Sequence, residues 1–443
     1  MDNSTAEGKP ALAYAWFVVA VLMLAYMFSF VDRQILNLLV APIRRDLGIS
    51  DTQISLLMGF SFAVFYTICG IPLARIADNS SRRRLIWAGV VVWSFMTALS
   101  GTAQRYGQVL LYRIGVGVGE AALSPAAYSM IADYFPAERR ATAISVYSMG
   151  IYIGSGIAFL VGGLVIQFAS AQGVVDLPLI GSTRPWQVVF LILGGAGILF
   201  SAVLLLIREP PRHGAAAKEQ LPLRRVLTYI GQNRRTMLCH NLGFALIALV
   251  SYGTGAWVPS FFVRIHHWNL AKVGLVYGLV TMIFGSAGVV FGGRLADRLR
   301  RNHVTDGPIR VGLWAAMACI PLGMIYLMVP SGEIAAVMLA PLIFCISMPF
   351  GCAPAAIQEI MPNTMRAQAS AIYLFSVNLI GLGLGPTAVA LVTDYVFHDD
   401  NAVRYSMMIV GSIANLCAIG LLALGLKPYR ETLVRLRATV VTA

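Results

Sequence analysis

Long apolar segments recur along the whole chain and constrain its fold more than any other feature. A helix needs roughly 20 apolar residues to cross a bilayer. Only 12% of the 443 residues are charged, whereas soluble domains have about 25%. The sequence therefore predicts an all-α membrane protein with twelve transmembrane helices in two six-helix bundles. The segments lie near residues 13–41, 54–76, 84–104, 107–133, 140–168, 186–207, 236–263, 272–296, 310–330, 333–360, 366–396 and 403–427.

A polar break separates the first six segments from the last six. Residues 208–235 contain Pro210, Pro211 and seven basic residues, which is typical of a linker and not of a membrane span. The predicted parts are an N-terminal tail at 1–12, a first bundle at 13–207, the linker at 208–235, a second bundle at 236–427 and a C-terminal tail at 428–443.

Basic residues are distributed unevenly between the two sides of the predicted membrane. Loops on the side of the termini hold 24 of the 33 Lys and Arg residues, the opposite loops hold seven, and Arg33 and Arg113 lie within helices. Loops rich in Lys and Arg stay in the cytoplasm, so both termini are predicted to be cytoplasmic. Topology thus accounts for the formal charge of +13, and no nucleic-acid partner is expected. Because Arg greatly outnumbers Lys, we expect the plasma membrane to be a bacterial inner membrane.

Two loop motifs recur at nearly the same offset. Asp78 follows the second segment as Asp297 follows the eighth, an offset of 297 − 78 = 219. Pro136 follows the fourth segment as Pro362 follows the tenth, an offset of 362 − 136 = 226. Both pairs of loops lie on the predicted cytoplasmic side. The sequence therefore indicates two parallel repeats of six helices.

These motifs resemble those of the major facilitator superfamily of secondary transporters, whose loop between helices two and three carries G-x-L-A-D-R-x-G-R-K. The second copy matches this motif in the run Gly293–Arg298, whereas the first copy keeps Asp78, Arg82 and Arg83. Val31-Asp32-Arg33 and the run Arg113–Ala121 further resemble the spinster-like lipid transporters. The resemblance implies two bundles that work by alternating access on a lysophospholipid or sphingoid lipid.

The repeated loops contain the candidate gating residues. A carboxylate beside a helix N-terminus gains about 0.3–1 kcal/mol from the helix dipole. We expect Asp78 to approach the eleventh helix, and Asp297 the fifth, when the cytoplasmic side closes. Solvated charges that only set topology are the alternative. The candidate gating residues are Asp78, Arg82, Arg83, Asp133, Arg140, Asp297, Arg298, Glu359 and Arg366.

Four charged residues lie at membrane depth, away from the ends of the predicted spans, and all are in the first half: Asp32, Arg33, Arg113 and Glu120. Charge at membrane depth is costly and marks functional sites. Arg113 and Glu120 are seven residues apart, so they share a helix face with about 10 Å between their backbones. If the first and fourth helices line a central cavity, as the resemblance implies, Asp32 and Glu120 approach each other with Arg113 as counter-ion.

Neighbouring carboxylates in a low-dielectric cavity oppose each other's ionisation, and can therefore carry protons near neutral pH. Proton coupling by Asp32, Glu120 and Arg113 is the resulting hypothesis, and a static ion-pair network is the alternative. The candidate substrate-binding residues are Arg33, Arg113, Glu120, His240, Asn241, Tyr373 and Asn378.

We expect an amphipathic substrate whose head lies near Arg113 and whose tail lies against the aromatic second half. A carrier of small organic or aromatic anions is the alternative. A polytopic membrane enzyme would need a nucleophile and base, or a metal, at membrane depth, and the sequence contains no such constellation. Glycines of the fourth, fifth and eleventh segments indicate close helix packing, not a nucleotide site. The expected partners of a monomer are the substrate, protons and membrane lipids, with no cofactor or metal.

Overall fold

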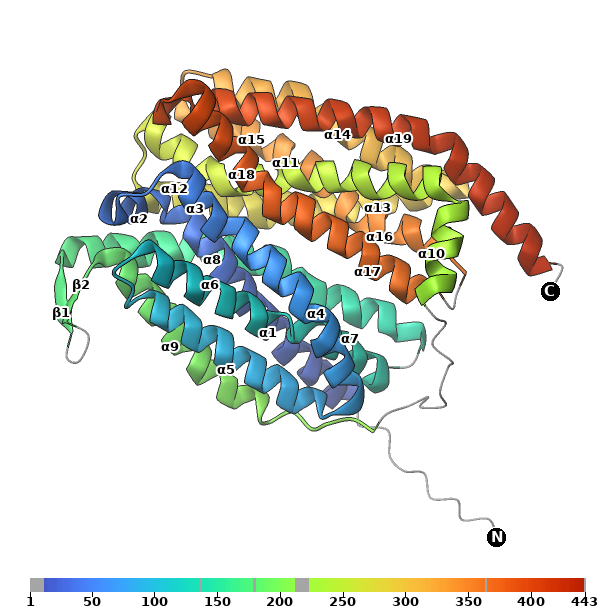
Figure 1. Cartoon of the computed structure of the whole chain (residues 1–443), viewed down its shortest axis with the longest axis horizontal. Helices are drawn as coiled ribbons and strands as arrows, with labels where there is room; N and C mark the ends of the chain where they lie inside the picture. Colours follow the sequence, from blue (N-terminus) through green and yellow to red (C-terminus); the bar gives the residue numbers. More distant parts are fainter. Residues whose placement is uncertain (1–11, 136, 178–180, 212–222, 363–364, 442–443) are drawn as a thin grey trace, which may run out of the picture. The chain divides into compact units, whose positions relative to one another are not determined.

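The computed structural model describes residues 12–135, 137–177, 181–211, 223–362 and 365–441, and its helices form twelve spans as predicted (Figure 1). The first half contains α1 (Leu12–Leu38), α2 (Val40–Leu47), α3 (Asp51–Ser55), the π-helix η1 (Leu56–Phe60), α4 (Ser61–Asn79), α5 (Arg82–Ser100), α6 (Tyr106–Glu120), α7 (Leu123–Tyr134), α8 (Ala137–Gln172) and α9 (Pro185–Leu204). The second half contains α10 (Leu223–Gln232), α11 (Arg234–His266), α12 (Leu270–Val280), the π-helix η2 (Thr281–Gly285), α13 (Ser286–Arg301), α14 (Gly307–Met328), α15 (Gly332–Ser347), α16 (Pro349–Glu359), α17 (Arg366–Ser376), the π-helix η3 (Val377–Leu384), α18 (Gly385–Val392), the π-helix η4 (Thr393–Phe397), the 3-10 helix η5 (Asp400–Ala402) and α19 (Val403–Val441).

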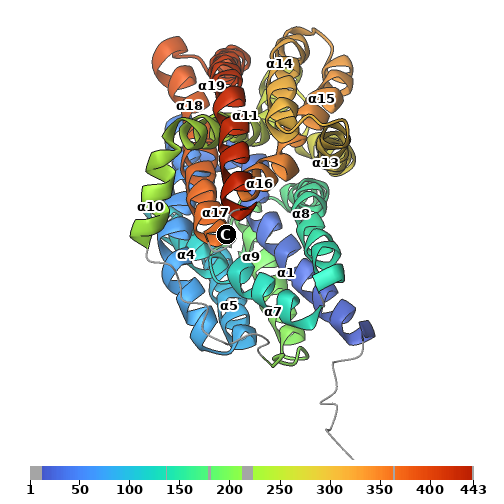
Figure 2. The same cartoon turned by 90° about the vertical axis from the view of Figure 1, so that its right-hand side faces the viewer.

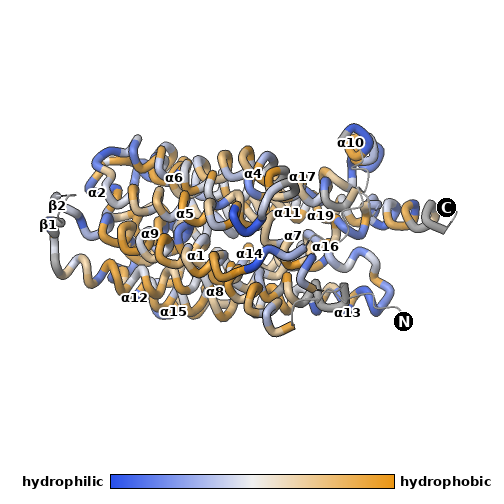
Figure 3. Tube along the Cα trace, turned by 90° about the horizontal axis from the view of Figure 1, so that it is seen from below, coloured by the Kyte–Doolittle hydropathy of each residue, from blue (hydrophilic) through white to orange (hydrophobic). Residues whose placement is uncertain are grey.

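The hydropathy of the helices suits a bilayer. Ten of the described helical stretches are long and apolar enough to cross one. The other two spans are α5, whose first turn contains three arginines, and the α6–α7 pair, which is interrupted after Glu120. Large apolar side chains such as Leu164, Leu199 and Leu424 are exposed, and hydrophobic stretches dominate most of the helices in Figure 3. A soluble protein rarely exposes this much apolar surface.

Tertiary contacts divide the chain into two compact units that do not coincide with its sequence halves. Unit 1 contains the residues up to Arg33, Phe65–Ser155 and Ala169–Ala216, and unit 2 contains Gln34–Val64, Gly156–Phe168 and the residues from Ala217 onward. Two stretches of the first half therefore pack with the second half inside unit 2. In the same unit α11, α14 and α19 pack against one another (Figure 2).

In unit 1, α5 packs against both α6 and α9. Trp93 of α5 is fully buried, and a Cβ at Gly119 of α6 would lie 2.8 Å from the Trp93 backbone nitrogen. Glycine at this position therefore allows the two helices to approach closely. This contact confirms the predicted packing role for Gly119, and it fixes the end of α6 that carries Glu120.

Glycines also join the first-half and second-half helices inside unit 2. A Cβ at Gly59 in η1 would lie 2.2 Å from the carbonyl oxygen of Leu382 in η3. A Cβ at Gly274 in α12 would lie 2.2 Å from the carbonyl oxygen of Phe159 in α8. No side chain fits at such distances, so both interfaces require glycine.

Two of the four π-helices in the described residues, η1 and η2, occupy corresponding positions in the two repeats. η1 begins at Leu56 and η2 begins at Thr281, an offset of 281 − 56 = 225. This value falls within the offsets of 219 to 226 between the repeated loops. A π-turn interrupts the regular α-helical hydrogen-bond ladder and often marks a functional position. The repeat thus includes an irregularity of the backbone as well as the loop motifs.

Several elements of the described residues lie outside the predicted helices, among them most of α2 and all of η5. The antiparallel hairpin of β1 (Val175–Leu177) and β2 (Gly181–Thr183) pairs Val175 with Thr183. α10 lies within the predicted linker, and α19 continues to Val441 through the segment predicted as a tail. Linker residues 212–222 and tail residues 1–11 lie outside the described residues.

Candidate functional site

The four membrane-depth charges predicted from the sequence come together inside unit 1. Asp32 and Arg33 lie on α1, and Arg113 and Glu120 lie on α6. Asp32, Arg113 and Glu120 are 5%, 1% and 1% exposed. Burial of this kind requires charge pairing or hydrogen bonds.

Glu120 is paired with Arg33. Its Oε2 accepts hydrogen bonds from Arg33 Nε and from Ser29 Oγ, both at 2.6 Å. Its Oε1 is buried and accepts no hydrogen bond from the described part of the chain. The carboxylate therefore has one oxygen held by two donors and a second oxygen that is available to a proton or a ligand.

Arg113 contacts Asp32 at the backbone of α1. Thr97 on α5 donates a hydrogen bond to Asp32 Oδ2 at 3.1 Å, and Arg113 Nη1 donates one to the Asp32 carbonyl oxygen at 3.1 Å. The sequence identified Arg113 as the expected counter-ion, whereas the ion pair to Glu120 comes from Arg33. Adjacent helical residues point about 100° apart, which lets Arg33 reach Glu120 while Asp32 faces Thr97.

Aromatic rings surround the guanidinium of Arg33. Its Cζ lies 4.8 Å from the Phe30 ring centroid and 4.9 Å from that of Tyr66. Cation–π attraction favours such positions, particularly where water is excluded. The two aromatic rings therefore provide a favourable environment for the Arg33 guanidinium in addition to the carboxylate of Glu120.

The second-half candidates form a separate group in unit 2. His240 is buried, with Nε2 2.9 Å from the Ala353 carbonyl oxygen and Nδ1 3.0 Å from Asn241 Oδ1. Its ring centroid lies 5.3 Å from that of Tyr373. Asn378 lies further along the same span, half-buried in η3. The structure brings His240, Asn241 and Tyr373 together, and their role in binding stays a prediction.

Arg82 forms the centre of an ion-pair group at one end of unit 1. Its Nε donates to Glu209 Oε1 at 2.8 Å, and its Nη1 donates to Asp133 Oδ2 and to Ser129 Oγ. Arg82 is 1% exposed. Burial raises the pKa of Glu209, but hydrogen bonds from the Arg83 backbone N–H and from Arg82 lower it below its ordinary value.

The second repeat contains the corresponding pair. Arg300 Nη1 donates to Glu359 Oε1 at 2.6 Å, and the Tyr429 hydroxyl donates to Glu359 Oε2 at 3.2 Å. Relative to Arg82 and Asp133, the offsets are 300 − 82 = 218 and 359 − 133 = 226. In each half, an arginine three or four residues after the repeated aspartate therefore pairs with the repeated acid.

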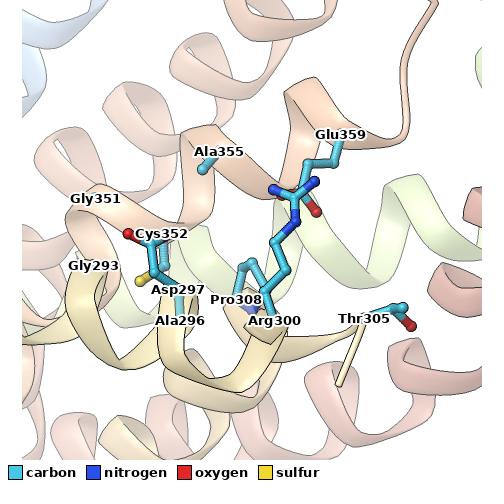
Figure 4. Close-up of a pocket in the computed structure, with 10 residues that line it drawn as sticks. All are labelled: Gly293, Ala296, Asp297, Arg300, Thr305, Pro308, Gly351, Cys352, Ala355 and Glu359. Carbon is cyan, nitrogen blue, oxygen red and sulfur yellow. The ribbon is translucent and has the colours of Figure 1, made fainter. Parts of the chain in front are cut away.

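A pocket of about 110 Å³ lies beside the second pair, and Figure 4 shows Arg300 and Glu359 directed toward each other at its edge. Asp297 lines the same pocket next to Cys352. Asp297 and Arg298 are exposed. The side chains of Asp78, Arg140 and Arg366 lie outside what the structure describes, so their gating role stays a prediction.

Sequence reasoning missed a charge network in unit 2 on the predicted non-cytoplasmic side. Asp51, whose side chain is fully buried, accepts two hydrogen bonds of 2.6 Å from Arg264 and lies 2.9 Å from Arg44 Nη1. Arg44 also pairs with Asp400 at 2.6 Å. Asp394 Oδ2 accepts hydrogen bonds from the Thr52 backbone and hydroxyl, both at 2.7 Å. First-half and second-half helices are joined by this network.

Local sequence explains how α3 presents Asp51. Ser50 caps α3 by accepting a hydrogen bond from the Gln53 backbone, and the Gln53 side chain accepts one from the Ser50 backbone. This capping box sets the start of the helix. Asp51 then lies in the first turn, where the helix dipole favours a negative charge.

Glu209→Gln is expected to reveal the pH dependence of the Arg82 group. Because the folded pKa of Glu209 is lowered, its stabilisation is present above the ordinary glutamate pKa and disappears as the pH falls through the folded value. Wild-type protein should therefore unfold at a higher temperature than the variant at pH 7, and the difference should shrink as the pH falls below the ordinary glutamate pKa of about 4.3. Thermal unfolding in detergent measures this. Glu431→Gln, at an exposed position, is the control, and a difference as large at pH 3 as at pH 7 would contradict the assignment.

The known proteins to which this chain is similar include transporters. A model of the Major Facilitator Superfamily matches residues 22–386. An MFS-type efflux pump of Mycolicibacterium smegmatis is 29% identical over 92% of this chain and 91% of its own. A probable L-galactonate transporter of Escherichia coli is 24% identical over 93% and 89%. The crystal structure of a bacterial homologue of the human lysosomal transporter Spinster, inward-facing and unoccupied, has a TM-score of 0.77, 26% identity, and coverage of 97% of this chain and 98% of its own.

Proposed function

Because the chain belongs to the Major Facilitator Superfamily, and is therefore a multi-pass transporter and not an enzyme, we propose that it couples proton movement to transport of an amphipathic, lipid-like substrate. Lysophospholipids and sphingoid lipids are the proposed class. The protein would work as a monomer by alternating access in a bacterial inner membrane. The observation that carries this proposal is the ion pair between Arg33 and the buried carboxylate of Glu120.

Charge counting explains the proposed coupling. Asp32 and Glu120 balance Arg33 and Arg113, so the buried group is neutral when both acids are ionised. A proton on Glu120 leaves one positive charge and releases Arg33 from its carboxylate partner. An anionic headgroup that binds Arg33 restores neutrality. Proton binding and anion binding therefore favour each other, and by linkage each strengthens the other by the same factor.

The surroundings of Arg33 favour an amphipathic substrate. Phe30 and Tyr66 place apolar ring surface beside the guanidinium, which suits a ligand whose charged group is attached to a hydrocarbon chain. The similarity to the Spinster homologue agrees with the resemblance to spinster-like lipid transporters in the sequence motifs, which implies the same class.

A carrier of small organic anions is the second candidate. The similarity to the probable L-galactonate transporter favours it, since a carboxylate would bind Arg33 or Arg113 in the same way. A panel of labelled lysophospholipids, sphingoid lipids, sugar acids and aromatic acids, tested in reconstituted vesicles, separates the two candidates.

Glu120→Gln and Asp32→Asn are expected to uncouple transport from the proton gradient. For wild-type protein, the apparent substrate affinity at pH 6 should exceed that at pH 8 by roughly 5- to 150-fold, the usual range of coupling between two ligands. In the Gln variant this ratio should approach one, because its side chain cannot gain or lose the proton. Uptake into proteoliposomes with a pH gradient imposed in each direction measures the effect. Glu431→Gln is the matched control, and wild-type pH dependence in both site variants would overturn proton coupling.

A further inference from the structure

We propose that α10 and the first turn of α11 form a binding surface for the headgroups of anionic phospholipids in the adjacent membrane leaflet. We call the exposed arginines Arg224, Arg225, Arg234 and Arg235 the corner arginines, because they flank the turn between these helices. This inference is independent of the transported substrate and of proton coupling.

α10 is oriented like a helix that lies along the membrane–water interface. Figure 1 shows α10 lying across the direction of the membrane-spanning α11, and Figure 3 shows it projecting at the margin of its unit. A helix that lies across the end of a span runs along the membrane surface, where amphipathic helices bind lipid.

One face of α10 packs against the rest of unit 2. Val226 is fully buried in the core of unit 2, and the Tyr229 hydroxyl donates a hydrogen bond of 2.8 Å to the Ile360 carbonyl oxygen. At the turn, Asn233 Oδ1 accepts hydrogen bonds from Thr432 Oγ1 at 3.3 Å and Arg435 Nη2 at 3.1 Å. These contacts fix which face of α10 points outward.

The outward face combines positive charge with apolar side chains. Leu227 is 52% exposed on α10, and Leu238 is 57% exposed in the first turns of α11. All four corner arginines are exposed. Guanidinium groups next to exposed leucines can bind phosphate while the leucines contact acyl chains.

The two helical segments that carry this charge contain no acid around the turn. Residues 223–238 contain the four corner arginines and neither Asp nor Glu. Within the described residues, no ion pair includes a corner arginine, whereas Arg300 is paired with Glu359 and Arg310 with Asp306. A cluster of four or more basic residues at the end of a membrane span is typical of anionic-lipid binding. Membrane topology alone would account for the positive charge of these arginines. It would not require a helix that is held against the protein on one face and exposes the arginines next to leucines.

Arg224→Gln/Arg225→Gln is expected to weaken the binding of phosphatidylglycerol. Purified full-length protein in detergent is titrated with phosphatidylglycerol labelled on its acyl chain, and binding is followed by fluorescence anisotropy. Each arginine near an anionic surface contributes a factor of about five, so the association constant should fall about 25-fold. Arg224→Lys/Arg225→Lys keeps the charge and should retain most of the binding.

Controls separate this site from net charge and from folding. Arg294→Gln/Arg301→Gln removes the same charge from exposed positions on α13, and should change the association constant less than twofold. Thermal unfolding confirms that each variant is folded. Equal losses in the two glutamine pairs, equally tight binding of phosphatidylcholine, or complete competition by millimolar inorganic phosphate would each overturn the proposal.

Discussion

Arg82→Ala is expected to lower the free energy of unfolding by about 3 kcal/mol, the lower end of the range for removing one partner of a buried ion pair. The variant leaves Asp133 and Glu209, 11% and 30% exposed, without their shared cation. Solvent near Glu209 reduces the effect, which is why the lower end applies. The loss should be seen by equilibrium unfolding in mixed detergent micelles.

Two further variants test whether the loss of stability depends on Arg82 itself. Arg84→Ala removes an exposed arginine from the same helical turn, and surface substitutions of this kind usually change stability by less than about 0.5 kcal/mol. Arg82→Lys should recover only part of the loss, because a single ammonium cannot replace the guanidinium that binds Asp133, Glu209 and Ser129 at once. Similar losses in Arg82→Ala and Arg84→Ala would refute the central role of Arg82.

Asp51→Asn is expected to open the predicted non-cytoplasmic side. Asp51 lies between Arg44 and Arg264, and its replacement leaves two arginines facing each other around a neutral amide. Removing the charged partner of a buried pair costs about 3–5 kcal/mol, and every 1.4 kcal/mol is a tenfold change in an equilibrium. If about half of that cost acts on closure, the opened fraction should rise at least tenfold.

Labelling of a cysteine at Ser55 measures this opening. Ser55 is fully buried, and its hydroxyl lies 3.4 Å from that of Thr387 in α18. In a background without native cysteines, the Ser55→Cys reaction with a membrane-impermeant thiol reagent should accelerate at least tenfold when Asp51→Asn is added. Glu333→Gln breaks an exposed pair with Lys272 on the same predicted side, and should leave the rate unchanged. An unchanged rate in Asp51→Asn would exclude the network as a closing contact.

The helices were predictable because a bilayer imposes its own length and hydropathy on every span. The predicted segment 186–207 corresponds to Pro185–Leu204, and 310–330 corresponds to Gly307–Met328. Boundaries at interruptions were less accurate. The first helix was predicted to continue to residue 41, whereas α1 ends at Leu38 and α2 begins at Val40. A short change of direction within an apolar run leaves no signal in hydropathy.

The membrane-depth residues were also predictable, but their partners were not. Their position at membrane depth identified Glu120 and Arg113 as candidates. Their spacing of seven residues indicated that their side chains need not pair with each other. The choice of Arg33 as the partner depends on side-chain direction across two helices, which spacing along one helix does not determine. Ser29 and Thr97 were missed because hydroxyl residues are common in membrane spans and lack a distinctive pattern.

The non-cytoplasmic network was hidden for a different reason. Arg44 and Asp400 are separated by 356 residues, and no local pattern relates them. A count of basic residues by loop assigns Arg44 and Arg264 to one side of the membrane but treats them as interchangeable charges. Their specific acidic partners become visible once the helix ends are placed together in unit 2.

The paired π-turns have a mechanical consequence. A π-turn holds one residue more than the corresponding α-helical turn. If η1 or η2 were converted to α-helical geometry, the helix beyond it would rotate by about 100°, since each residue of an α-helix advances it by that angle. Gly59 in η1 would then lose its register with Leu382, and new side chains would face the partner helix. In each repeat, the π-helix η1 or η2 is thus a point about which the helix can rotate. The helix surface on one side of it can change while the surface on the other side keeps its contacts.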